Sequence, residues 1–369
     1  MSKLFSFNNA IIIWFNANKR NLPWRKTKDP YKIWVSEVIL QQTRVNQGIS
    51  YYKRFVNEFK NITMLANAEI KEVMNLWQGL GYYSRARNMH EAAKQIMNEF
   101  GGQFPDSYNT IIRLKGVGRY TAAAIASICF DEPIPVIDGN VYRVISRFRG
   151  ITTAIDSNKA YFEFYKITLE FLGKSNPGVF NQAVMELGAT ICTPVNANCK
   201  ICPISEYCYA YKNNMIHLFP VKTKQPKIRI RYFNYLVLIK GNVIFLKRRN
   251  QNDIWKLLYD FPLIETNSDL NAEELFNFDE WEKYRNIQKM HILNISKTYL
   301  HKLTHQTIYA KFYKFRLSDT KSIEFEKLIG VEMNQIPSFP VPRLIEKYLS
   351  DEFGIIKKMH YLSGNENLS

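Results

Sequence analysis

The stretch from Leu114 to Asn140 contains two glycines and an aspartate that are candidate functional residues. Gly116 and Gly118 precede an alanine-rich helical run, and Asp138 comes just before a second one, Val141–Phe148. Glycines allow turn conformations that other residues resist, and free backbone N–H groups at a helix start suit a phosphate oxygen. Such a hairpin would hold a nucleic-acid backbone and bring Asp138 near the adjoining sugar. The alternative is an ordinary joint between helices, with Asp138 as an N-cap.

A second carboxyl group, Glu37, lies inside an apolar helical stretch, Tyr31–Arg44. Ile33, Trp34 and Leu40 are among its neighbours at helical spacing. A carboxyl buried there would have a raised pKa and could act as a general acid near neutral pH. The alternative is a glutamate that reaches the surface or pairs with an arginine.

Four cysteines follow in one short loop, with the spacing C-x6-C-x2-C-x5-C: Cys192, Cys199, Cys202 and Cys208. Four thiolates at such spacing bind an iron–sulfur cluster or zinc. Zinc sites usually pair two C-x-x-C knuckles and this loop has one, so the spacing favours the cluster. Cys129 stands apart and is expected to pack in the core.

Two polar segments could touch nucleic acid. Gln41–Arg44 gives the expected helix a polar tip, which could fill the gap left by a displaced base, or could be plain helix-end polarity. Gly79–Arg87 combines a glycine turn with aromatic residues and two arginines, which suits a backbone contact with a stacking ring. The alternative for Gly79–Arg87 is the start of a helix, with Tyr82 packed in the core. His301 and His305 lack an evident third ligand, so we expect binding-loop or packing roles.

The bulk composition fits a globular protein with a polyanionic partner. The 369 residues are 46% hydrophobic, with a net charge of +17 and a pI of about 9.5. An AT-rich genome that favours lysine would also give such a charge. No apolar run reaches the length of a membrane span. Met1–Arg20 reads as an amphipathic helix without a signal cleavage site, so we expect a cytosolic protein with reduced thiols.

The pattern changes from helical to strand-like along the chain. The periodicity predicts helices over Met1–Arg20, Tyr31–Arg44, Ile49–Phe59, Ile70–Leu76 and Ala92–Phe100, and helical structure from Ser157 to Leu187. After the basic stretch Val221–Lys227, alternation predicts a β-hairpin of Tyr235–Ile239 and Val243–Leu246, strands near Ile292–Tyr299 and Thr307–Phe315, and helices around Asp279–Asn286 and Arg343–Leu349. A separate α+β domain therefore follows the helical part.

These residues together resemble the adenine DNA glycosylases of the MutY type, within the helix-hairpin-helix glycosylase superfamily. The resemblance covers most of the chain and rests on segments in the family's order: Leu22–Arg25, Trp34–Thr43, Gly79–Arg85, Leu114–Gly118, Val136–Asn140 and the four-cysteine loop. The hairpin and the cysteine loop are shared with endonuclease III relatives. The Glu37 segment and the C-terminal domain separate the two families.

The resemblance implies removal of adenine mispaired with 8-oxoguanine or guanine in duplex DNA, with the adenine flipped out of the stack. Glu37 would protonate the adenine, Asp138 would stabilise the positive sugar, and Asn140 would orient Asp138 or the water. Tyr120 stands where bifunctional relatives carry a lysine nucleophile. A phenol cannot form a Schiff base, which implies a monofunctional enzyme.

The resemblance also implies binding roles. Gln42 and Tyr82 would intercalate near the lesion, and a [4Fe-4S] cluster would sit on the four cysteines. The C-terminal part is similar to a MutT-like domain that senses 8-oxoguanine without a nudix box. The family's Phe-Ser-His loop appears as Leu303-Thr304-His305, so the 8-oxoguanine preference could be weaker. The full set of expected DNA contacts is Arg25, Gln42, Thr43, Tyr82, Ser84, Arg85, Gly116, Gly118, Thr304 and His305.

The implied fold class is a mainly α glycosylase followed by an α+β MutT/nudix-like domain. We expect an iron–sulfur helical domain (1–20 and 129–212), a six-helix domain with the hairpin (21–128), a linker (213–228), a MutT-like domain (229–355) and a tail (356–369). The expected partner is double-stranded DNA with A:8-oxoguanine or A:G mispairs, bound by a monomer in the cytoplasm. The rivals are an endonuclease III-like lyase and a non-catalytic iron–sulfur DNA-binding protein.

Overall fold

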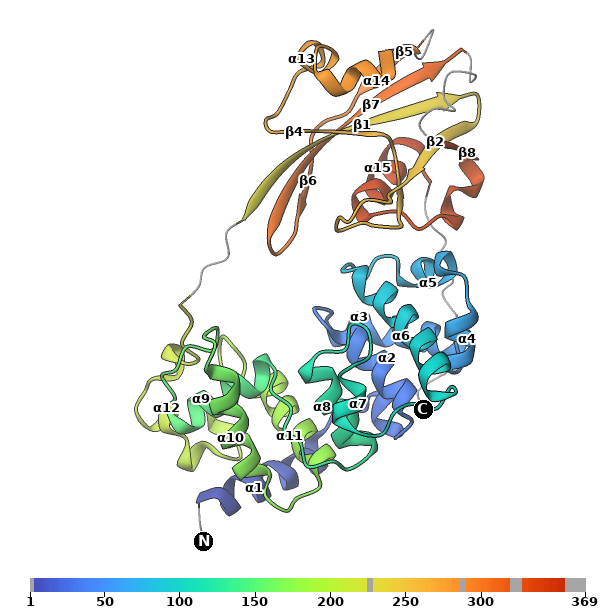
Figure 1. Ribbon diagram of the computed structural model, residues 1–369. Coiled ribbons are helices and arrows are strands. Elements are labelled where there is room, and N and C mark those ends of the chain that lie inside the picture. The colour runs from blue at the N-terminus through green and yellow to red at the C-terminus, as the bar shows by residue number, and fades with distance from the viewer. Residues whose placement is uncertain (1–2, 224–227, 286–289, 319–326, 356–369) are drawn as a thin grey trace, which may run out of the picture. The chain divides into compact units, whose positions relative to one another are not determined.

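The computed structural model describes residues 3–223, 228–285, 290–318 and 327–355. The chain forms two compact units (Figure 1). The first comprises residues 1–68 and 87–225, and the second comprises residues 69–86 and 226–369. No helix of the described residues is long and apolar enough to cross a membrane.

The first unit is helical. Its α-helices are α1 (Lys3–Asn18), α2 (Pro30–Leu40), α3 (Val45–Glu58), α4 (Ile62–Asn67), most of α6 (Ser84–Phe100), α7 (Tyr108–Ile111), α8 (Arg119–Cys129), α9 (Gly139–Arg149), α10 (Ala160–Leu172), α11 (Pro177–Thr190) and α12 (Tyr209–Lys212). Short 3-10 turns cover Pro23–Lys26, Cys199–Ile201, Ser205–Tyr207 and Ile216–Leu218. The helical structure predicted from Ser157 to Leu187 is two helices, α10 and α11.

Helix α2 is the buried central helix that the apolar pattern predicted. Asp29 caps its start by accepting the Tyr31 N–H at 3.0 Å, and Pro30 occupies the first turn. The helix packs against α3 and α8. The predicted end at Arg44 was wrong: α2 ends at Leu40, because Gln42 adopts a left-handed φ of 58° that a helix cannot contain.

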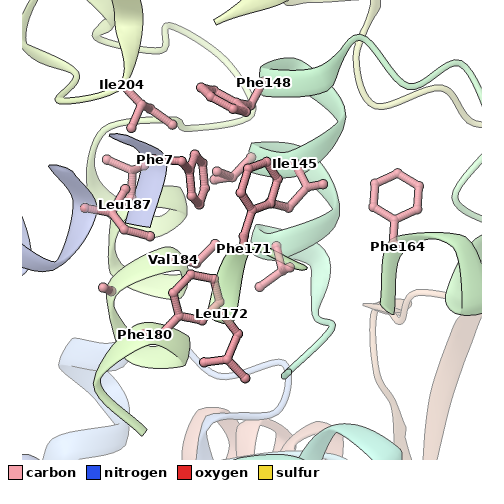
Figure 2. Packing of buried hydrophobic residues seen from close by; sticks show 14 of the residues in the cluster. Phe7, Ile145, Phe148, Phe164, Phe171, Leu172, Phe180, Val184, Leu187 and Ile204 are labelled. Atoms are coloured by element: carbon pink, nitrogen blue, oxygen red, sulfur yellow. The ribbon is translucent and has the colours of Figure 1, made fainter. Parts of the chain in front are cut away.

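Helix α11 organises the rest of the first unit by packing against α1, α8 and α9. Phe7 from α1, Ile145 and Phe148 from α9, and Phe180 and Leu187 from α11 meet in one core (Figure 2). This core supports both α9, which Asp138 precedes, and the cysteine loop, which follows α11.

The second unit is built on an eight-stranded mixed sheet in the order β3-β2-β1-β7-β5, with β4 beside β1, β6 beside β7 and β8 beside β2. The strands are β1 (Arg229–Lys240), β2 (Val243–Arg248), β3 (Tyr259–Asp260), β4 (Leu263–Thr266), β5 (Met290–Ile295), β6 (Tyr299–Lys302), β7 (Gln306–Leu317) and β8 (Ile329–Glu332). Strands β1 and β7 run parallel, from Arg229 opposite Gln306 to Ile239 opposite Arg316.

Helices complete the second unit: α5 (Ile70–Trp77), the first turn of α6, α13 (Ala272–Phe276), α14 (Glu282–Arg285) and α15 (Arg343–Phe353), with 3-10 turns at Asp279–Trp281 and Met333–Ser338. Tyr348 of α15 stacks on Phe312 of β7 with ring centroids 3.8 Å apart, which anchors α15 on the sheet.

Two predictions for the second unit need correction. The strand predicted over Ile292–Tyr299 is two short strands, β5 and β6, because a bulge and a loop interrupt the pairing with β7. The predicted helix Asp279–Asn286 is a 3-10 turn followed by the short α14, and Asn286 lies outside the described residues. The predicted tail from residue 356 also lies outside them.

Candidate active site and cysteine loop

Segments far apart in sequence line one cavity in the first unit, with a volume of about 250 Å³. Its walls come from α2 and the turn before it, from α8, from the start of α9 and from α11. Glu37, Asp138, Tyr120 and Asn140 all line it, together with Arg25 and Thr43. The four residues predicted to do chemistry are therefore brought together, although 101 positions separate the two acids in the sequence.

Glu37 is buried in the wall of this cavity, with 6% of its surface exposed. Burial raises the pKa of its carboxyl to about 7, and the nearby Asp138 charge adds to the rise, while the Tyr120 hydroxyl and Arg25 oppose it. The Tyr120 hydroxyl donates a hydrogen bond to Glu37 Oε2. At neutral pH this carboxyl can therefore hold or release a proton.

Asp138 is both an N-cap and a wall of the cavity, so the two readings of the sequence are compatible. Its Oδ1 accepts the Val141 N–H at 2.7 Å, and its Oδ2 accepts the Asn140 side-chain amide at 2.8 Å. Burial raises the pKa of Asp138, and these two hydrogen bonds oppose the rise by favouring the charged form. The carboxylate is thus held in one orientation.

Arg143, which the sequence analysis did not single out, links Asp138 to the cysteine loop. Its guanidinium donates to Asn140 Oδ1 at 2.8 Å, to the Gly188 carbonyl at 2.7 Å and to the Cys192 carbonyl at 2.7 Å. Arg143 lies about one turn into α9, and its side chain is buried, with 8% exposed. Arg143 is therefore a positioning residue for Asn140 and, through it, for Asp138.

A third acidic residue in the cavity, Glu186 on α11, was also missed. It is 1% exposed and forms ion pairs of 2.7 Å with Arg20 and Arg25. Burial alone would raise the pKa of Glu186, but the hydrogen bonds from the two arginines together outweigh burial and lower the pKa to about 2. Glu186 lies between apolar residues on a helix, as Glu37 does, so the argument used for Glu37 could have found it. Arg25, expected to contact DNA, is engaged in this pair.

The glycine hairpin leads into α8. Gly116 has a φ of +74°, and a Cβ there would lie 2.5 Å from Asn88, so only glycine fits. The expectation of an unusual conformation at Gly118 was wrong, because its φ of −94° is open to any residue. A Cβ at Gly118 would meet nothing within 4 Å, so the missing side chain leaves the backbone accessible.

The four cysteines line one cavity with Arg147 and Tyr211. The Arg147 guanidinium lies 3.4 Å from Cys192 Sγ and donates to the Thr193 carbonyl at 2.7 Å. Among the described residues, no three or more His, Cys, Asp or Glu side chains lie close enough together to hold a metal ion as they stand. Cys129 is half-buried at the end of α8, away from this loop.

The predicted DNA-contacting residues differ in their surroundings. Gln42 and Tyr82 are exposed and both have left-handed backbones, with φ of 58° and 46°. Ser84 is exposed at the start of α6. Arg85 is not available as a surface cation: it is 8% exposed, and its guanidinium donates to the Gly81 carbonyl at 3.0 Å, which braces the glycine turn.

The loop between β6 and β7 carries the last two predicted contacts. Thr304 and His305 are exposed, and the Thr304 hydroxyl lies 2.6 Å from the Tyr82 hydroxyl, within hydrogen-bond distance. His301 instead packs against Trp255, with ring centroids 5.6 Å apart.

Two family models match parts of this chain. Residues 35–168 match the family model described as HhH-GPD superfamily base excision DNA repair protein, and residues 234–351 match the NUDIX domain model. An adenine DNA glycosylase of Buchnera aphidicola from Schizaphis graminum is 34% identical over 94% of this chain and 98% of its own length. The mouse adenine DNA glycosylase is 43% identical over 56% of this chain and 42% of its own.

Solved structures match the helical part. A thermostable thymine-DNA glycosylase, 28% identical, superposes with a TM-score of 0.54 over 57% of this chain and 97% of its own. An endonuclease III–DNA complex, 20% identical, shares the fold with a TM-score of 0.51. The near full-length similarity to the Buchnera relative, together with the match of both domains, shows that the chain belongs to the adenine DNA glycosylases, the DNA N-glycosylases of base excision repair.

Proposed function

We propose that the enzyme removes adenine mispaired with 8-oxoguanine or guanine in duplex DNA, after flipping the adenine into the cavity of the first unit. The observation that carries this proposal is the pairing of Glu37, whose pKa is about 7, with the hydrogen-bonded Asp138 in one cavity. Two carboxyl groups with different environments are what acid-assisted cleavage of a glycosidic bond requires.

In this mechanism Glu37 donates its proton to the adenine ring, and the bond between the base and the sugar breaks with its electron pair going to the adenine. Positive charge then develops on the sugar, where the Asp138 carboxylate stabilises it directly or by a covalent bond. A water molecule adds to the sugar and gives one proton to the Glu37 carboxylate, which the first step left unprotonated; Asn140, which hydrogen-bonds Asp138 at 2.8 Å, keeps Asp138 aligned. Adenine and an abasic site are the products.

Glu186 has a different part in the same cavity. With a pKa of about 2, it stays ionised at neutral pH and can only accept hydrogen bonds. We assign it, with Arg25, to holding the flipped base, since the adenine amino group is a donor. The cavity would thus contain three carboxyl groups: Glu37 gives a proton, Asp138 stabilises the sugar, and Glu186 accepts hydrogen bonds from the base.

We propose that the enzyme is monofunctional. Strand cleavage by a lyase needs an amine that forms a Schiff base with the sugar. By the family resemblance, Tyr120 stands where such a lysine would be, and the described residues that line the cavity include no lysine. Burial first, and then the Glu37 charge, raise the pKa of Tyr120 well above its usual value, so the phenol stays neutral.

The cysteine loop would hold a [4Fe-4S] cluster through Cys192, Cys199, Cys202 and Cys208. Four thiol groups on one cavity, with a guanidinium beside Cys192 Sγ, fit an anionic cluster, whose core is larger than a single ion. When bound, the cluster would hold the loop in shape. Through Arg143, a fixed loop would keep Asn140 and Asp138 in place.

The second unit would read the base opposite the adenine. We propose that Tyr82 and Gln42 insert into the duplex, and their left-handed backbones support this because such strain is concentrated at functional sites. We propose that the Thr304 hydroxyl, which lies 2.6 Å from the Tyr82 hydroxyl, contacts the lesion, while Leu303 lacks the ring of the family's loop. Ser84, Thr43 and the hairpin glycines would hold the DNA backbone.

We propose the domain boundaries given in the sequence analysis. We also propose that the protein is a monomer and that it is located at the chromosomal DNA in the cytoplasm.

A base-release assay tests the proposal. The protein is incubated with duplexes that contain A:8-oxoguanine, A:G or A:T pairs, and strand breaks are measured with and without alkali. Breaks only after alkali, and only in the mispaired duplexes, are expected. Nicking without alkali, together with an adduct trapped by borohydride, would identify the lyase. DNA binding without any base release would identify a non-catalytic protein.

A further inference from the structure

Arg119 is the first residue of α8, directly after the hairpin glycine Gly118, and its side chain is exposed. Its guanidinium lies 4.5 Å from the centre of the Tyr161 ring and 5.6 Å from the centre of the Phe162 ring. Both rings belong to the start of α10, which is about forty residues later in the sequence. Helix α10 therefore supplies a surface on which the hairpin arginine rests.

The rings also pack against one another. Tyr161 contacts Phe162 edge-on, with centroids 5.5 Å apart, and contacts Tyr165 at 5.9 Å. Phe162 is nevertheless 65% exposed, so its ring is not a core residue. A guanidinium that stacks on ring faces keeps its N–H edges free for an anion, and losing its rotational freedom beforehand reduces the cost of binding.

Among the described residues, Arg119 forms no ion pair with an acidic side chain; its guanidinium lies over the two rings, and its charge also acts on the nearby Tyr142. Arg20, Arg25, Arg231 and Arg249, by contrast, all form ion pairs. An unneutralised, preorganised guanidinium beside a backbone that glycines leave accessible is suited to a phosphate oxygen.

We propose that Arg119 binds a phosphate of the DNA backbone, and that Tyr161 and Phe162 hold its guanidinium in the binding orientation. The DNA interface of the hairpin would thereby extend onto α10. This inference rests on the proposed function only in taking DNA as the ligand. Tyr161 and Phe162 are positioning residues, because they act through the arginine.

The test is equilibrium binding of the full-length protein to two DNA duplexes, measured over a series of salt concentrations. One duplex has a central A:G pair whose adenosine carries 2′-fluorine, which blocks excision, and the other is fully paired. Arg119→Gln should weaken binding to both about tenfold or more, the loss of one charged hydrogen bond, and should reduce the slope of log K against log salt by about 0.9. Phe162→Ala should weaken binding only about two- to fivefold and leave the slope unchanged, because the charge remains.

Two further variants make the test decisive. Lys174→Gln removes an exposed cation just past the other end of α10, roughly 18 Å along the helix from residue 162, and should change neither affinity nor slope. The double variant Arg119→Gln/Phe162→Ala should bind no more weakly than Arg119→Gln. The proposal is overturned if Arg119→Gln binds like Lys174→Gln with circular dichroism unchanged, or if Phe162→Ala weakens binding equally in the Arg119→Gln background. The readout is binding, so it stands whether or not adenine is excised.

Discussion

Replacing Tyr120 by phenylalanine should move the pH dependence of excision in a direction that the structure fixes. The Tyr120 hydroxyl donates a hydrogen bond to Glu37 and thereby lowers the pKa of that carboxyl, which burial has raised to about 7. Phenylalanine keeps the ring and the burial but removes the donor. The charged form of Glu37 then loses a stabilising interaction, so its pKa should rise.

The size of the shift follows from the strength of the lost interaction. A hydrogen bond to a charged group contributes about 1.5–3 kcal/mol, and one pKa unit corresponds to about 1.4 kcal/mol, so the pKa of Glu37 should rise by about 1–2 units. A general acid works in its protonated form, and the rate therefore falls as pH rises through its pKa. The wild type should lose rate above about pH 7, and Tyr120→Phe should lose it only about 1–2 pH units higher.

The assay is single-turnover excision with enzyme in excess over a mispaired duplex, measured from pH 5 to 10, with DNA saturation checked at each pH. The test is the pH at which the rate falls on the alkaline side of the pH–rate profile, and it does not depend on the absolute rate of the variant. A limb that stays in place, or moves to lower pH, would show that Tyr120 does not act on the proton of Glu37.

Two other variants test the residues that support the site. Glu186→Gln removes the carboxylate that pairs with two arginines, so the free energy of unfolding at pH 7, measured by urea denaturation, should fall by about 3 kcal/mol. Because the pKa of Glu186 is lowered to about 2, the extra stability of the wild type should be present above about pH 4.5 and should fade as the pH falls toward 2. Arg143→Gln removes the link between Asn140 and Cys192, so excision should slow while DNA affinity stays within a fewfold; an unchanged single-turnover rate would remove the positioning role.

Local sequence patterns predicted the elements that carry the site. The apolar residues around Glu37 predicted a buried helix, and the helix α2 is buried as expected. The glycine hairpin, the helix after Asp138 and the alternating strands of the second unit are also present. These features depend on side chains that are close in sequence, so periodicity and capping residues report them.

The partners of the charged groups could not be predicted in the same way. Glu186 meets Arg20 across 166 positions, and Arg143 reaches the carbonyl of Cys192 across 49. Such pairings depend on how helices pack, which no local pattern records. Arg85 shows the converse error, because an arginine in a glycine turn suggested a surface contact, whereas the turn's own carbonyls bind the guanidinium.

Release of free adenine by wild-type protein and by Glu37→Gln tests the central claim most directly. Glutamine keeps the size and polarity of Glu37 but cannot donate the required proton, so the variant should bind the mispaired duplex as the wild type does and release no adenine detectable by chromatography. Adenine released by Glu37→Gln at the wild-type rate would mean that another group protonates the base, and the account of this site would be wrong.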